Sequence, residues 1–136
     1  MILLDTDYAI SGYDNALQAV YLKYKRKGNS AEFREANLQL LKSIMKTPSH
    51  RLYVDARNMG VVAPEDQKWV ANQVVPQLAS FAPKKFLYIA SVLSEHVFTK
   101  MAVDTVVELS NSLGVCQNKQ FSSEVEAKSW LLQWGL

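Results

Sequence analysis

The chain has 136 residues, of which 49% are hydrophobic and 21% are charged, and its formal net charge at pH 7 is +2. This length and composition are typical of one globular domain with a full hydrophobic core, and they exclude wholesale disorder. A net charge this small does not indicate nucleic-acid binding, and the only basic cluster, residues 23–27, is interpreted as a solvated turn.

Two strands are expected at the start of the chain, over residues 3–11 and 17–24. The turn residues Gly12 and Asn15 lie between them and predict a β-hairpin. Apolar residues occur on both faces of the second strand, which indicates a sheet with both faces at least partly covered.

The first helix is predicted after Gly28. Asn29 and Glu32 have the spacing of a capping box, and Pro48 prevents the helix from continuing. A buried strand is expected over residues 52–56. The second helix begins at Pro64, because a proline in the first turn loses no hydrogen bond, and Pro76 is expected to kink or end it.

The second half of the chain continues the alternation of strands and helices. A fourth strand is predicted over residues 84–91, where the apolar run 86–90 is typical of a central parallel strand. A third helix is expected from Ser94 to about Gly114, then a strand over residues 115–121 and a closing helix capped by Ser123. The order ββαβαβαβα predicts an α/β fold in one domain, residues 1–136. An N-terminal hairpin leads into a mainly parallel five-stranded sheet with helices packed on it.

Five stretches in this order resemble the SpoIIAA-like family, whose fold is of the STAS/SEC14 type and which occurs in small bacterial proteins. They are VDARNM, PEDQKWV, VVPQL, SEHVFTKMAVD and FSSEVEAKSWL. The founding members are anti-sigma factor antagonists with a phosphorylatable serine at the start of the helix after the third strand. Residues 58–66 contain no Ser or Thr here, so the resemblance does not imply that switch. The SEC14 side of the family implies binding of an apolar ligand.

The predicted functional corner lies beyond the carboxyl ends of the strands, where open α/β sheets bind ligands. Asp55, Arg57, Asn58 and Met59 follow the third strand, and Arg57 has the fork geometry for a carboxylate or phosphate. The alternative is that Asp55 and Asn58 hydrogen-bond the turn while Arg57 pairs with an acid.

Ser91, Ser94 and His96 follow the next strand and are predicted to share this edge. His96 beside Glu95 is a candidate acid or base, and helix capping is the alternative for this group. Trp130 and Trp134 are expected either to pack on the sheet or to form a dimer contact.

Neither a metal nor a cofactor is predicted. The two histidines, His50 and His96, are far apart in sequence, and no glycine-rich phosphate loop is present. Cys116 is the only cysteine. It is expected to be buried, and a nucleophile pair with His96 has no local motif. The absence of a disulfide, a signal peptide and a long apolar stretch predicts a soluble cytoplasmic protein.

The leading hypothesis is a non-enzymatic interaction or regulatory module that binds an unknown protein partner or a second copy of itself. The alternative is a protein that binds a small apolar or anionic, lipid-like ligand through Arg57. An enzyme using His96 or Cys116 is a third, weaker hypothesis.

Overall fold

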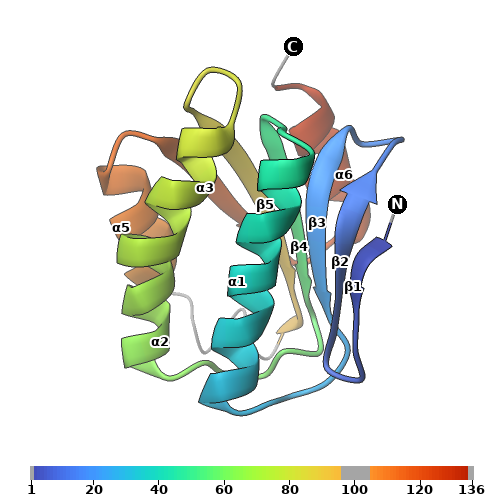
Figure 1. The fold of residues 1–136 in the computed structure, drawn as a ribbon, viewed down its shortest axis with the longest axis vertical. Helices are drawn as coiled ribbons and strands as arrows, with labels where there is room; N and C mark the ends of the chain where they lie inside the picture. Colours follow the sequence, from blue (N-terminus) through green and yellow to red (C-terminus); the bar gives the residue numbers. More distant parts are fainter. Residues whose placement is uncertain (1, 96–104, 135–136) are drawn as a thin grey trace.

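A six-stranded mixed sheet forms the centre of the protein (Figure 1). The computed structural model describes residues 2–95 and 105–134. The strands are β1 (Ile2–Asp5), β2 (Ala9–Asp14), β3 (Ala19–Tyr24), β4 (Arg51–Ala56), β5 (Leu87–Leu93) and β6 (Cys116–Phe121). Their order in the sheet follows the chain; β1, β2 and β3 pair antiparallel, and β3 to β6 pair parallel. The predicted α/β class is therefore confirmed, but the prediction of five strands is wrong.

The extra strand arises because the predicted strand over residues 3–11 is folded back on itself. The hydroxyl of Thr6 accepts hydrogen bonds from the backbone N–H groups of Tyr8 and Ala9, and the N–H of Thr6 donates to the carbonyl of Ala9. These bonds close a tight turn between β1 and β2. The turn after β2 also differs from the prediction, since Gly12 lies within β2 and the carboxylate of Asp14 caps the turn instead.

The helices form two unequal layers, as Figure 1 shows. Those described are α1 (Ser30–Lys46), α2 (Pro64–Trp69), the π-helical turn η1 (Val70–Val74), α3 (Val75–Phe81), α5 (Thr105–Ser112) and α6 (Glu124–Leu132). All except α6 cover one side of the sheet, which we call the broad face, and α6 alone packs on the other side, the α6 face (Figure 1). The strand order never reverses, so the described sheet lacks the switch point at which doubly wound folds bind ligands.

Local sequence signals account for most helix ends. The predicted capping box is present at α1, where Asn29 accepts from the N–H of Glu32 and Glu32 accepts from the N–H of Asn29. Pro64 occupies the first turn of α2. Pro76 lacks an N–H group, and the chain before it adopts the π turn, in which Val75 donates to the carbonyl of Val70.

Each face of the sheet has its own core. The larger core lies under the broad-face helices and includes Val20, Leu22, Leu40, Ile44, Leu52, Leu78, Leu87 and Ile89. The smaller core lies under α6 and includes Leu17, Ala19, Tyr53, Ala90, Val92, Phe121, Ala127 and Leu131. Burial of apolar surface on both faces stabilises the sheet and explains the apolar residues on both sides of β3.

Candidate functional site

Asp55 and Arg57 form a closed ion pair at the end of β4. Asp55 is buried on the α6 face, and both of its oxygens accept hydrogen bonds from Arg57, from Nε at 3.0 Å and from Nη2 at 2.6 Å. The same Nη2 also lies 3.2 Å from Oε2 of Glu124 on α6. Burial acts to raise the pKa of Asp55, but the hydrogen bonds from Arg57 outweigh it and lower this pKa. Of the two alternatives for Arg57, the structure therefore shows the pairing with acids.

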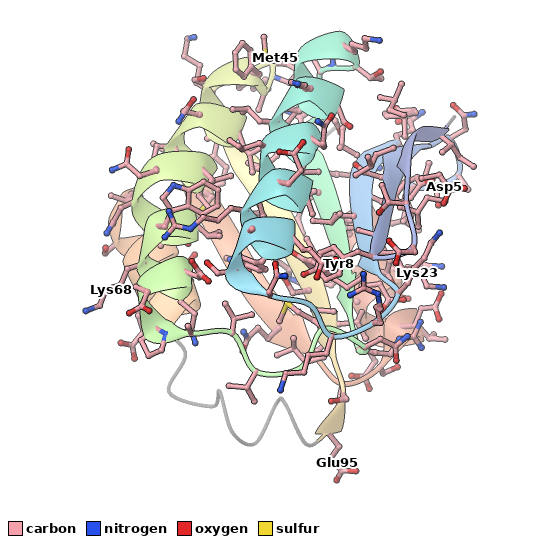
Figure 2. All side chains as sticks on the ribbon, turned by 60° about the horizontal axis from the view of Figure 1, so that its bottom comes forward. Asp5, Tyr8, Lys23, Met45, Lys68 and Glu95 are labelled. Atoms are coloured by element: carbon pink, nitrogen blue, oxygen red, sulfur yellow. The ribbon has the colours of Figure 1, made fainter. Side chains whose placement is uncertain are left out.

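A shallow cavity of about 270 Å³ adjoins this pair on the α6 face. Its wall is highly charged, and it contains Asp14, Tyr21, Leu22, Lys23, Tyr53, Asp55, Arg57, Glu124 and Lys128. Figure 2 turns this edge of the sheet toward the viewer, where Lys23 lies close to the end of β3. The buried hydroxyl of Tyr53 has no hydrogen-bond partner, and burial, together with the nearby Glu124 and Asp55 charges, raises its pKa. The charges of this cavity are largely compensated by one another.

The predicted site residues do not form one cluster, because they lie on opposite faces of the sheet. Successive residues of a strand point to opposite faces, so Asp55 points to the α6 face while its neighbour Val54 points to the broad face. Ser91 pairs with Val54 across the sheet, and Met59 is buried in the broad-face core. The structure thus brings Met59 and Ser91 together at one cavity and leaves Asp55 and Arg57 at another.

The remaining edge residues contribute less. Asn58 is exposed after β4, and Ser94 is half-buried after β5. Figure 2 shows Glu95 at the same edge, beyond β5. His96 lies outside the described residues.

The second cavity, which we call the inner cavity, lies between the broad face of the sheet and the helices and is partly open to solvent. Its volume is about 100 Å³. Apolar side chains form most of its wall, and they include Leu52, Val54, Ala56, Met59, Val62, Val70, Leu78, Ile89 and Leu93. Six amide or hydroxyl side chains complete its polar part, namely Tyr24, Asn37, Gln67, Ser91, Asn118 and Gln120. Gln67 is held in place by a 2.8 Å hydrogen bond from its Nε2 to the carbonyl of Val62.

Sequence reasoning missed the polar wall of this inner cavity. Asn118 and Gln120 lie two residues apart on β6, and Ser91 pairs with Gln120, so these three side chains share the broad face. The signal was present in the segment CQNKQF, where amides alternate with exposed residues in a strand that begins and ends buried.

Trp130 and Trp134 belong to an aromatic cluster against β5. The ring of Trp134 stacks on Tyr88 at a centroid distance of 5.4 Å, and Trp130 contacts both Tyr88 and Phe121. Phe86, the residue before β5, packs edge-on against Tyr88 and extends the cluster. Trp134 is nevertheless 38% exposed, so the cluster reaches the surface.

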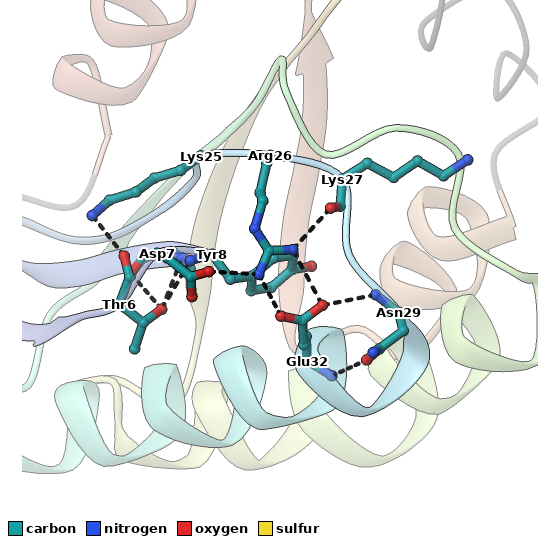
Figure 3. A network of polar contacts seen from close by, with 9 residues as sticks. Thr6, Asp7, Tyr8, Lys25, Arg26, Lys27, Asn29 and Glu32 are labelled. Atoms are coloured by element: carbon teal, nitrogen blue, oxygen red, sulfur yellow. Dashed lines mark hydrogen bonds and ion pairs between the residues drawn. The ribbon is translucent and has the colours of Figure 1, made fainter.

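Two of the four basic side chains at residues 23–27 pair with nearby acids, as Figure 3 shows in part. Lys25 bonds to Asp5 and to the carbonyl of Thr6. Arg26 pairs with Asp7 at 3.0 Å and with Glu32 at 2.6 Å. These pairs reduce the positive field that this cluster offers to a phosphate backbone.

In the described part of the chain, no group of three or more metal-binding side chains comes together. Cys116 is buried, its thiol donates to the carbonyl of Ser110, and burial raises its pKa to about 11. Within residues 2–95 and 105–134, no helix combines the length and apolar character needed to cross a membrane.

No family model, no curated protein and no solved structure matches this chain. The resemblance to the SpoIIAA-like family and the functions that it implies therefore stay predictions. The class that the structure establishes is an α/β domain with a mixed six-stranded sheet.

Proposed function

We propose that this protein binds a small, mainly apolar molecule in the inner cavity and acts without catalysis. The proposal rests on the partial exposure of the Val54 side chain. Val54 lies in the middle of the sheet, between β3 and β5 and on the face that the helices cover, yet it is only half-buried. Because a residue in this position normally belongs to the core, its exposure marks space that the described side chains do not fill.

The energetic cost of this space supports a role for it. At about 24 cal/mol per Å³, a closed, empty cavity of about 100 Å³ would cost roughly 2 kcal/mol, a substantial part of the stability of a small domain, and this partly open cavity costs less. A bound apolar molecule would restore the lost contacts. The proposal agrees with the ligand binding that the SEC14 side of the resemblance implies, although the cavity has room for a much smaller molecule than a membrane lipid.

The proposal is tested by filling the cavity. Val54 and Val70 both line it and both are half-buried, so the double variant Val54→Ile, Val70→Ile occupies part of the space. We expect this variant to gain about 1 kcal/mol of stability. We also expect toluene to raise the melting temperature of the natural protein and not that of the variant, since only a ligand that binds the folded state stabilises it.

The matched control is Val125→Ile, the same substitution at a residue of α6 that is 75% exposed. Its melting temperature should respond to toluene as the natural protein does. No toluene effect on the natural protein, or an equal effect on the filled variant, contradicts the proposal.

A second candidate is an interaction module that binds a second copy of the chain through the aromatic cluster. The observation that favours it is the exposed edge of Trp134 beside Tyr88, since aromatic residues are enriched in interface cores. Sedimentation velocity over a wide concentration range tests this. A dimer that Trp134→Ser abolishes supports the candidate, provided that circular dichroism shows the variant folded, and a monomer at every concentration contradicts it.

A further inference from the structure

β6 forms one outer edge of the described sheet, and an outer strand presents backbone groups that can pair with another strand. The N–H of Leu87 on β5 donates to the carbonyl of Val115, so residues 115, 117, 119 and 121 direct their backbone groups to β5. The backbone groups of residues 116, 118 and 120 therefore point outward, and Asn118 lies at the centre of this outer edge.

The side chain of Asn111 occupies the edge at Asn118. Its Oδ1 accepts a 2.7 Å hydrogen bond from the N–H of Asn118, and its Nδ2 donates a 3.2 Å hydrogen bond to the carbonyl of Asn118. A side-chain amide carries the same acceptor and donor as a backbone peptide group. One asparagine side chain therefore satisfies both of the backbone groups that a neighbouring strand would bind at Asn118.

The connection between α5 and β6 places Asn111 beside Asn118. Asn111 lies in the last turn of α5, and Gly114, at a φ of 73°, reverses the chain before β6 begins at Cys116. The thiol of Cys116 donates to the carbonyl of Ser110 and holds the same end of α5 against β6. Asn111 itself is exposed, so its side chain is not part of either core.

The opposite edge of the sheet is protected in other ways. β1 has only four residues, and its pairing with β2 shifts register between Ile2 and Leu4. Lys25 bonds to Asp5 and to the carbonyl of Thr6 at the end of this strand. Short strands, bulges and lysines are common protections of edge strands. β6 is longer, with six residues, and pairs with β5 without a register shift, so it is the edge more open to strand addition.

The strand that suits this edge is β6 of a second copy of the chain. β6 contains no proline and only one charged residue, Lys119, so it can pair along its whole length. If two copies paired antiparallel about a two-fold axis at Asn118, Gln117 of each copy would lie opposite Lys119 of the other. Like charges would therefore not meet across the new pair.

We infer that the side chain of Asn111 closes the outer edge of β6 and prevents the sheets of two copies from joining there. The protein thus has a surface for a second copy that its own side chain keeps closed. The inference concerns backbone groups of β6, and it depends neither on a ligand in the inner cavity nor on the aromatic cluster.

The experiment compares Asn111→Ala with the control Asn72→Ala, the same change at an exposed asparagine of η1. In amide hydrogen exchange followed by NMR, we expect the N–H of Asn118 to exchange at least roughly fivefold faster in Asn111→Ala than in the natural protein, because it loses one hydrogen bond. The N–H of Lys119, which points to β5, should change little. Sedimentation velocity should show stronger self-association of Asn111→Ala than of the natural protein or the control.

A carboxylate at the same position separates edge protection from a general loss of stability. Asn111→Asp keeps an oxygen that can accept from the N–H of Asn118, and it adds a negative charge that opposes the pairing of two copies. We expect this variant to associate no more than the natural protein.

Three results would overturn the inference. They are equal association of Asn111→Ala and Asn72→Ala, an unchanged exchange rate of the Asn118 N–H in Asn111→Ala, and association of Asn111→Asp as strong as that of Asn111→Ala. If Asn111→Ala fails to fold, the natural protein still provides a test, because exchange of the Asn118 N–H at the rate of an unprotected amide contradicts its bond to Asn111.

Discussion

Arg51 is expected to be one of the residues on which the stability of this protein depends most. Its side chain is 4% exposed and bonds to three backbone carbonyls. The distances are 2.6 Å from Nε to the carbonyl of Trp134, 2.7 Å from Nη1 to that of Leu17 and 3.4 Å from Nη2 to that of Leu132. These carbonyls belong to the β2–β3 turn and to the end of α6, so one guanidinium joins both to β4. The cation also lies at the negative end of the α6 dipole.

The substitution Arg51→Lys keeps the positive charge but removes the planar guanidinium with its several N–H donors. The lysine side chain is shorter and ends in a single ammonium nitrogen, which does not span two carbonyls on separate segments as a guanidinium does. A hydrogen bond to a charged group contributes about 1.5–3 kcal/mol, and a buried carbonyl left without its donor, such as that of Leu17, adds a further cost. With at least one of the two short bonds lost, we expect the free energy of unfolding to fall by about 2–4 kcal/mol.

Equilibrium unfolding in urea, followed by circular dichroism and by tryptophan fluorescence, measures this loss. The control is Arg26→Lys, at an arginine whose side chain is 42% exposed and whose partners Asp7 and Glu32 are 84% and 32% exposed. Ion pairs open to solvent contribute little to stability, so this control should change little. The reasoning is refuted if Arg51→Lys costs no more than Arg26→Lys.

Three further perturbations test other parts of the structure. Burial alone would raise the pKa values of Asp55 and Asp66, but arginine hydrogen bonds outweigh it and lower both. These carboxylates therefore stabilise the fold above their unfolded pKa of about 3.9 and lose this effect as the pH falls below it. Urea midpoints between about pH 2 and pH 7 should show this loss, and Asp66→Asn should reduce it; an unchanged profile in that variant contradicts the assignment. Gly28→Ala should cost about 1–3 kcal/mol in thermal unfolding, because the added Cβ would lie 2.3 Å from Cε1 of the Tyr8 ring. The same change in a Tyr8→Leu background should cost much less, and equal costs in both backgrounds would exclude the clash. The thiol of Cys116, with its pKa raised to about 11 by burial, should react with a thiol reagent at neutral pH only after unfolding, so rapid labelling of the native protein would contradict its burial.

Local signals predicted the parts of the fold that neighbouring residues control. The capping box of Asn29 with Glu32 and the first-turn position of Pro64 were both predicted correctly, because the groups that interact there are a few residues apart. The extra turn at Thr6 was missed, since a single hydroxyl that accepts two backbone N–H groups leaves no periodic pattern. The predicted strand over residues 3–11 therefore became two.

The candidate site shows the same division. Asp55 and Arg57 were singled out by their place after a buried strand, but sequence alone left two interpretations of Arg57 open. Only the folded chain shows that Arg57 pairs with Asp55 and with Glu124, which is 67 residues away in sequence. Ser91 was also singled out, yet its true neighbours are on β4 and β6, and the alternation of strand side chains places it on the face opposite Asp55.

Patterns in the sequence were enough to predict the α/β class, the positions of most helices and strands, and the burial of the central strands, because periodicity, capping and proline act within one element. Contacts between distant segments decided what lies on each face of the sheet and left the space beside Val54. They also include the bond between Arg51 and Trp134, whose positions differ by 83 residues. Such features depend on the register between strands and on contacts between distant segments, and no local pattern in the chain records either of them.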